Sequence, residues 1–248
     1  MKKTTWLMWI LFTAVSMGLR LWQTLAGYED SGLAKADFLP GILLPAVLLA
    51  ATVFLALSAR GLPNRRTEGQ RLGVDFRFAD NMPAVFCAVT GSFLVMLGGG
   101  LFAVSAAGSL MRLLPALLVV LSGGCALYMA FALYRENDPQ GLALLVPICA
   151  LIVLLVYVYR TNASDPVLMR SYIETLAVAA LTASTTLRAA FYYGGSNPRR
   201  YVPVSALSAL LSLTAAAEGG SLAYAALFVG YAAIELSYLA AANFSTQG

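Results

Sequence analysis

The residues most able to do chemistry are charged side chains that fall inside long apolar stretches. Glu235 lies near the middle of the apolar segment 221–243, and Tyr231 precedes it by one helical turn. At about 100° per residue, Tyr224, Phe228, Tyr231 and Glu235 share one stripe of a helix. A carboxylate that faces lipid is costly, so this stripe is predicted to face other helices or a wet cavity. Aromatic rings around a carboxylate suit a cationic or ring-bearing ligand.

Among the other charged residues that lie in apolar segments or at their ends, four are candidates for ion pairs. Arg20 and Glu174 are at similar heights when counted from the ends of their segments, so they are predicted to form an ion pair that acts as a gate. Arg170 is one turn from Glu174 and is an alternative partner. Arg188 reaches Glu235 only if its side chain turns inward rather than toward the headgroups.

Two interpretations of these polar residues stay open. They either bond helices to one another, or they form a pathway for a substrate or a proton. On the second interpretation, the predicted substrate-binding residues are Glu235, Tyr231, Tyr224, Phe228, Thr185, Gly99 and Gly123. The predicted gate or ion-pair residues are Arg20, Glu174, Arg170 and Arg188.

The two glycines of that set belong to glycine clusters in neighbouring apolar segments, 98–100 and 122–124. Small residues allow two membrane helices to approach closely, which predicts tight packing of this helical hairpin. The alternative is that one or both helices break there and expose backbone groups to a substrate near the middle of the membrane.

Composition places these residues in a membrane protein. The 248 residues are 60% hydrophobic and 11% charged, with a mean hydropathy of +0.77, whereas about a quarter of the residues of a soluble domain are charged. We therefore predict an all-α, polytopic integral membrane bundle, with residues 1–248 forming a single membrane domain. The net charge of +4 is attributed to arginines beside the membrane, and no nucleic-acid partner is expected.

Hydropathy predicts eight transmembrane helices. They run near 4–27, 38–59, 82–107, 110–134, 141–160, 166–192, 201–217 and 221–243. The seventh is the shortest, so seven helices is the competing prediction. With eight, ten Lys and Arg residues fall on the side of the termini and four on the other side, which predicts that both termini are cytoplasmic.

A polar connection precedes the third predicted helix. In it Leu72, Val74, Phe76 and Phe78 alternate with polar or small residues, a pattern typical of an extended segment with one apolar face. This segment is expected either to insert its apolar side chains into the membrane surface or to bind a partner protein.

These patterns predict a membrane carrier, or the substrate-binding membrane subunit of a transporter, for a small cationic or aromatic molecule. The alternative is a non-catalytic scaffold or assembly subunit of a larger complex, and a lipid-modifying enzyme is a less favoured third. The chain contains no histidine, and no hydrolase, phosphate-loop or metal-site motif occurs, so no enzyme activity, cofactor or metal is predicted.

The expected location and partners follow from the same patterns. We expect a multi-pass protein of the bacterial plasma membrane, the cytoplasmic or inner membrane. Its expected partners are the lipid bilayer, a small-molecule ligand, and other membrane or ATP-coupling subunits.

Overall fold

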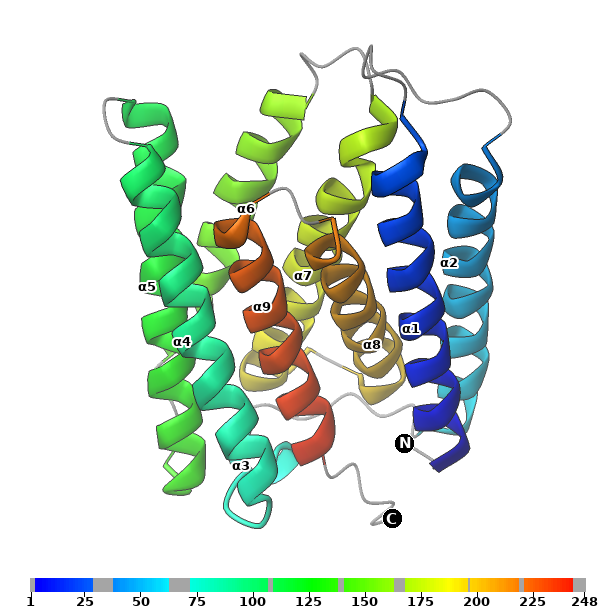
Figure 1. The fold of residues 1–248 in the computed structure, drawn as a ribbon. Coiled ribbons are helices and arrows are strands. Elements are labelled where there is room, and N and C mark those ends of the chain that lie inside the picture. Colours follow the sequence, from blue (N-terminus) through cyan, green and yellow to red (C-terminus); the bar gives the residue numbers. More distant parts are fainter. Residues whose placement is uncertain are drawn as a thin grey trace.

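The chain is a bundle of eight long helices in the computed structural model, which describes residues 3–28, 38–62, 72–106, 109–137, 141–162, 168–195, 197–218 and 221–242 (Figure 1). The long helices are α1 (Lys3–Ala26), α2 (Leu39–Ser58), α4 (Met82–Ser105), α5 (Leu110–Tyr134), α6 (Gly141–Asn162), α7 (Leu168–Tyr193), α8 (Pro198–Ala216) and α9 (Leu222–Ala241). A 3-10 turn, η1 (Ala59–Gly61), and a short helix, α3 (Leu72–Asp75), lie between α2 and α4. The predicted all-α class is confirmed, and the helix bounds lie within three residues of the predicted ones.

Local sequence accounts for several of these bounds. The side chain of Asn81 accepts a hydrogen bond from the Ala84 amide at 3.2 Å and caps α4, and Asn197 accepts one from Arg199 at 3.0 Å at the start of α8. A proline follows each cap within the first turn, where its missing N–H is not needed. Gly194 has a φ of 80°, a conformation that ends α7 at little steric cost.

Six of the long helices form a closed ring. Each helix from α4 to α9 contacts the next one, and α9 contacts α4. The hairpin of α1 and α2 packs on α8 outside this ring, as Figure 1 shows. In this ring the neighbours of α9 are α8 and α4. A side chain that joins α9 to α5 or to α7 therefore crosses the interior of the ring.

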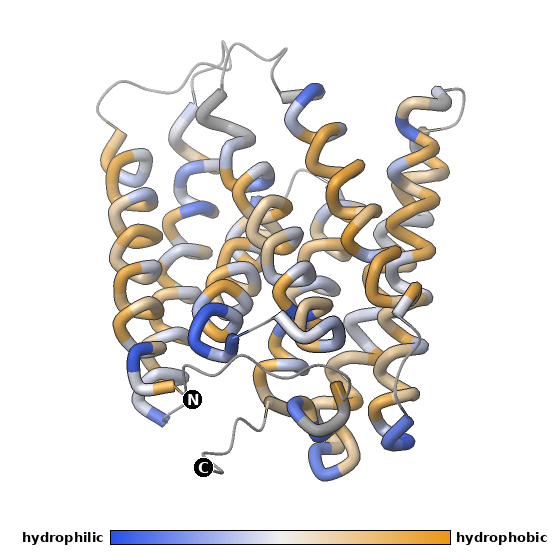
Figure 2. The backbone as a smooth tube through the Cα atoms, turned by 180° about the vertical axis from the view of Figure 1, so that it is seen from behind, coloured by the Kyte–Doolittle hydropathy of each residue, from blue (hydrophilic) through white to orange (hydrophobic). Residues whose placement is uncertain are grey.

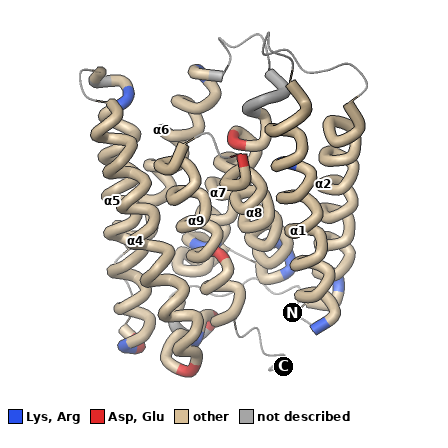
Figure 3. The backbone as a smooth tube through the Cα atoms, in the orientation of Figure 1, with Lys and Arg blue, Asp and Glu red and all other residues tan. Residues whose placement is uncertain are grey.

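The two ends of the bundle differ. We call the end where α1 begins and α9 finishes the terminal end, and the opposite end the far end (Figure 1). Basic residues gather at the helix ends on the terminal side, and acidic residues of the α7 and α8 segments lie close together nearer the far end (Figure 3). At the far end, α8 stops and α9 starts well below the ends of α1, α5, α6 and α7 (Figure 1). The end of α8 and the start of α9 are therefore set back from the far end of the bundle.

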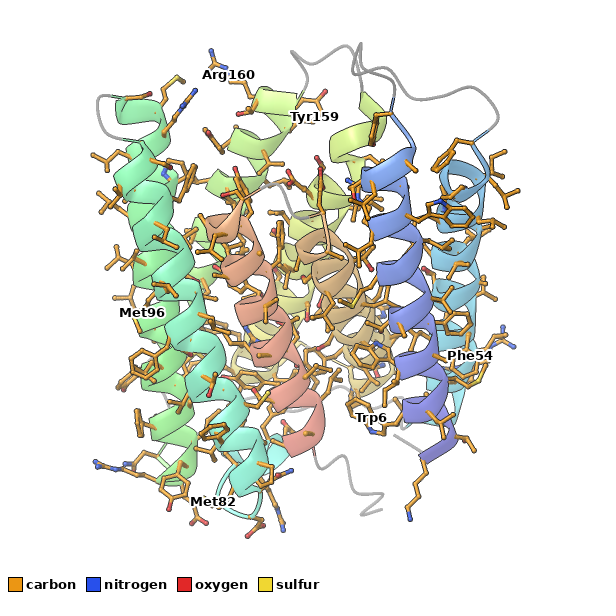
Figure 4. All side chains as sticks on the ribbon, viewed as in Figure 1. Trp6, Phe54, Met82, Met96, Tyr159 and Arg160 are labelled. Carbon is orange, nitrogen blue, oxygen red and sulfur yellow. The ribbon has the colours of Figure 1, made fainter. Side chains whose placement is uncertain are left out.

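The outside of the bundle is suited to lipid. Leu25, Phe86 and Val104 are 85%, 74% and 77% exposed. So large an exposed apolar surface is unfavourable in water, but not in contact with lipid chains. Hydrophobic residues dominate along the helices and hydrophilic residues lie mainly at bends and ends (Figure 2). Figure 4 shows Tyr159 and Arg160 at the far end of α6 and Met82 at the terminal end of α4.

By length and hydropathy, six of the described helices could cross a membrane: α1, α2, α4, α5, α6 and α9. The other two, α7 and α8, are more polar. Most residues of α8 are buried, and it contacts α1, α2, α7 and α9. A helix that other helices shield from lipid need not be apolar on every face, and 19 residues span about 28 Å. Eight crossings therefore stay the prediction.

The glycine clusters serve helix packing. A Cβ added at Gly99 would lie 2.9 Å from atoms of Val119 and Val120 on α5, and one added at Gly123 would lie 2.6 Å from Met96 on α4. Both helices run through these clusters without interruption. The suggested helix break at Gly99 and Gly123 is therefore wrong, and the alternative of close packing holds.

The segment after the polar connection does not form the expected extended wedge. Residues 72–75 are helical, and Leu72, Phe76 and Phe78 are fully buried in the protein itself. The Arg77 amide donates a 2.9 Å hydrogen bond to the Ala241 carbonyl at the end of α9. We call residues 72–78 the plug segment, because it fills the terminal end of the ring. Burial also raises the pKa of Asp75 in this segment.

Candidate functional site

The first of two charged centres joins α7 to α9 across the ring. The Arg188 Nη1 atom lies 3.0 Å from Glu235 Oε1. The other carboxylate oxygen of Glu235 accepts hydrogen bonds from the hydroxyls of Ser184 on α7 and, at 2.7 Å, Ser205 on α8. Three helices thus meet at one carboxylate. The Arg188 side chain thus turns inward to Glu235 and not toward the lipid headgroups, which was the other predicted possibility.

Aromatic rings close this centre on the terminal side. The Arg188 guanidinium lies over the Tyr238 ring at 4.3 Å from its centroid, a cation–π contact. Below it, the Phe76 ring meets Phe191, Tyr201 and Tyr238 edge-on at centroid distances of 5.4, 5.5 and 5.4 Å. Glu235 is 1% exposed, so the centre is sealed by side chains.

The second centre lies at the end of α8 that points toward the far end of the bundle. Arg20 of α1 is fully buried, and its Nη2 atom is 2.6 Å from Glu218 Oε2 just after α8. Its Nη1 atom donates to the Gln23 side chain at 2.9 Å. This Arg20–Glu218 ion pair was not predicted, and the predicted pair of Arg20 with Glu174 stays a prediction. The Arg20–Glu218 pair forms because α1 packs on α8, whose end carries Glu218.

A cavity of about 230 Å³ opens beside this second pair. We call it the recess pocket. Its lining residues come from α7, the end of α8 and the start of α9: Glu174, Ala215, Ala216, Glu218, Ser221, Tyr224 and Ala225. Two carboxylates from different helices and one phenol therefore share a single hollow, and the Figure 3 view places the acidic parts of α7 and the α8 end next to each other.

Hydroxyl groups line α8 between the two centres. Ser205, Ser208 and Ser212 are fully buried and recur at a spacing of three and four residues, so they lie on one face of α8. Ala215 and Ala216 continue this face into the recess pocket. The hydroxyls of Ser208 and Ser212 donate to backbone carbonyls of Ser205 and Ser208 at 2.8 and 2.7 Å. These three serines form a buried polar face of α8 between the two centres.

The remaining predicted residues lie apart from the recess pocket. The Tyr231 hydroxyl is 2.9 Å from the Ser122 hydroxyl and joins α9 to α5. Phe228 is fully buried and stacks with Tyr224, and the Thr185 hydroxyl donates to the Leu181 carbonyl at 2.7 Å. The side chain of Arg170 lies outside the described residues.

The structure thus divides the predicted site residues among several places. Glu174 and Tyr224 line the recess pocket, and Arg188 and Glu235 form the sealed centre. Sequence analysis missed Ser184 and Ser205. Ser184 lies one turn before Arg188, and a search for hydroxyls one turn from each charge would have found it. Among the residues that the structure describes, no group of three or more metal-ligating side chains is placed to hold a metal ion.

In the described ranges, fold and site together define a polytopic α-helical membrane protein with two buried ion pairs and an acidic pocket. Comparisons with protein-family models, curated proteins and solved structures find no match. Its activity is therefore inferred from geometry alone.

Proposed function

We propose that the protein is a membrane carrier for a small organic cation, which binds in the recess pocket. The observation that carries this proposal is the convergence of Glu174 and Glu218 on one hollow beside Tyr224. Carboxylates bring charge complementarity to a cation, and a tyrosine ring adds a cation–π surface. An acidic hollow inside an apolar bundle is costly to maintain without a role.

The groups that line the pocket favour a cation over an anion. Its charged lining residues, Glu174 and Glu218, are both carboxylates, and Arg20, which pairs with Glu218 at 2.6 Å, is not a lining residue. A volume of about 230 Å³ is below the range of roughly 300–1,000 Å³ for drug-sized ligands. A ligand with few heavy atoms, such as a simple alkylammonium ion, therefore fits best.

The other end of the bundle supports the same proposal. A carrier must not be open at both ends at once. Here the recess pocket opens toward the far end of the helix ring, whereas at the terminal end of the ring Leu72, Phe76 and Phe78 of the plug segment are fully buried. In our proposal Glu235 receives the cation or a proton later in the cycle, after Arg188 and the plug segment move. The hydroxyl face of α8 would lead from the first position to the second.

The proposal also covers orientation and partners. The terminal end is assigned to the cytoplasm, because basic residues gather there (Figure 3), and the membrane is assigned as the bacterial cytoplasmic membrane. Tyr231, Phe228 and Thr185 would act by supporting the path rather than by touching the ligand in the conformation described. Any coupling to ATP would come from another subunit.

The test is electrogenic uptake of tetramethylammonium and ethylammonium into liposomes that contain the purified protein. Glu174→Gln should weaken the apparent affinity about tenfold, which corresponds to about 1.4 kcal/mol. Glu136→Gln, at the exposed terminal end of α5, is the matched control and should leave uptake unchanged. If no cation of this series is bound or moved by the unaltered protein, the carrier proposal is wrong.

An assembly subunit is the second candidate, and the sealed Arg188–Glu235 pair favours it. A buried, hydrogen-bonded ion pair can serve to fix helix order without any ligand. The same Glu174→Gln variant separates the carrier from the assembly subunit. An assembly subunit should copurify with its partner subunits equally well with and without this substitution. A lipid-modifying enzyme is the third possibility, and the described residues include no group of three or more His, Cys, Asp or Glu side chains placed to hold a metal ion for it.

A further inference from the structure

A hollow at the terminal end collects arginines from two separate parts of the chain. It measures about 620 Å³ and is lined by Ala56, Arg60, Leu187, Arg199, Arg200, Pro203 and Val204. Arg60 follows α2 in η1, whereas Arg199 and Arg200 belong to the first turn of α8. The three charges therefore meet only because α2 packs on α8. We call this hollow the arginine groove.

The arginine groove is suited to an anion. No carboxylate is among its lining residues, and in the described part of the chain Arg60, Arg199 and Arg200 form no ion pair. Guanidinium groups bind phosphate oxygens in a bidentate manner. Placing three of them together is unfavourable by mutual repulsion, so an anion in the groove would stabilise the arrangement.

The position of the groove indicates which anion it would bind. Its wall is apolar at Ala56, Leu187 and Val204, and the neighbouring face of α2 exposes Val53 and Leu57 by 52% and 50%. A free phosphate ion would gain nothing from these apolar surfaces, whereas the acyl chains of a lipid would. Basic pockets between helices at the cytoplasmic side are the usual binding sites of anionic lipid headgroups.

We propose that the arginine groove binds one anionic glycerophospholipid, with its phosphate among Arg60, Arg199 and Arg200 and its acyl chains along α2. This site is independent of the recess pocket, since the two lie at opposite ends of the bundle and share no lining residue. A bound lipid here would join the α1–α2 hairpin to the helix ring.

The experiment is native mass spectrometry of the full chain in detergent, titrated with dioleoylphosphatidylglycerol and, separately, with dioleoylphosphatidylcholine. We expect one phosphatidylglycerol molecule to bind preferentially. Arg60→Gln/Arg200→Gln should lower this affinity about 25-fold, or about fivefold for each arginine removed. Arg60→Lys/Arg200→Lys keeps both charges and should retain most of the binding. Circular dichroism of each variant confirms that the helices are intact.

Arg77→Gln/Arg135→Gln is the matched control, because it removes two charges from the same end of the bundle outside the groove. Equal loss of binding in this control would overturn the proposal, since it would show attraction to net charge only. Inorganic phosphate that competes fully at millimolar concentration would show a free-anion site instead. Loss of binding on Arg112→Gln/Arg160→Gln alone would place the lipid at the far-end hollow that these two residues line, which also overturns the proposal.

Discussion

The two buried ion pairs use the same chemical groups in opposite surroundings. In the Arg188–Glu235 pair both side chains are buried, and two serine hydroxyls and a tyrosine ring complete the contacts. In the Arg20–Glu218 pair the arginine is buried, but the Glu218 side chain is 13% exposed and borders the recess pocket. From this difference we infer that the Arg188–Glu235 pair holds helices together, whereas the Arg20–Glu218 pair presents charge to a ligand in the recess pocket.

The largest expected effect comes from removing one member of the sealed pair. Arg188→Met leaves Glu235 buried without its cation, so the free energy of unfolding should fall by about 3–5 kcal/mol. Arg188→Met/Glu235→Leu should recover most of this loss, because it leaves no unpaired charge. Thermal unfolding in detergent micelles measures both. A loss below about 1 kcal/mol in the single variant would show that water reaches Glu235 and that the two pairs are alike.

The next effect concerns what seals the pair. Phe76→Ala removes a ring that meets three aromatic neighbours and should cost about 3 kcal/mol. In a background without native cysteines, a Ser205→Cys thiol should react with a maleimide added at the terminal end only when Phe76→Ala is also present. Phe86→Ala, on the lipid-facing side of α4, is the control and should change neither result. Reaction of the thiol with Phe76 intact would contradict the sealed centre.

A smaller effect is expected at the open pair. Glu218→Gln keeps a hydrogen-bond acceptor near Arg20, and the adjoining pocket admits water, so the loss of stability should be about 1.5 kcal/mol. This loss of stability is smaller than the loss expected for Arg188→Met. The difference between the two losses measures how strongly burial differs between the two ion pairs. Unfolding of both variants under the same conditions shows which loss is larger. A larger loss for Glu218→Gln than for Arg188→Met would reverse the comparison.

The smallest effect involves the plug segment and pH. Burial holds the pKa of Asp75 above its ordinary value of 3.8, so the folded protein binds this proton more tightly than the unfolded chain does. Stability should therefore decrease as pH rises from 3.8 through the pKa of the folded state. Asp75→Asn removes that decrease and should be the more stable form at neutral pH, with the advantage vanishing below pH 3.8. Unfolding temperatures measured at several pH values test the sign, and an advantage that grows toward acid would contradict it.

Sequence analysis predicted the eight long helices because hydropathy over about 19 residues is a strong property of membrane helices. It also identified Glu235, Glu174 and Arg20 as buried or pocket-lining charges, since a charge in an apolar helix must avoid lipid. These inferences need only the residue pattern within one helix. That pattern does not show which other helix packs against it.

What could not be predicted depends on contacts between distant segments. The contact of Arg20 with Glu218 was not predicted because it depends on α1 packing against the end of α8. The burial of Phe76 was missed because an alternating pattern at a membrane surface does not distinguish lipid from the protein's own interior. Gly99 and Gly123 were ambiguous, because both close packing and a helix break call for glycine.

One consequence follows from the contacts of α9. The helix carries Tyr224 at the recess pocket and Glu235 in the sealed centre, and its last turn holds the plug segment through the bond from Arg77 to Ala241. Between these points Gly230 touches α4 so closely that a Cβ there would lie 2.7 Å from the Gly91 carbonyl oxygen. A Cβ at Gly98 of α4 would lie equally close to α9, 2.7 Å from the Ala223 carbonyl oxygen, so the two backbones are in contact over more than one turn. A shift of α9 against α4 at the recess pocket would therefore also displace Glu235 and the end of α9 that holds the plug segment.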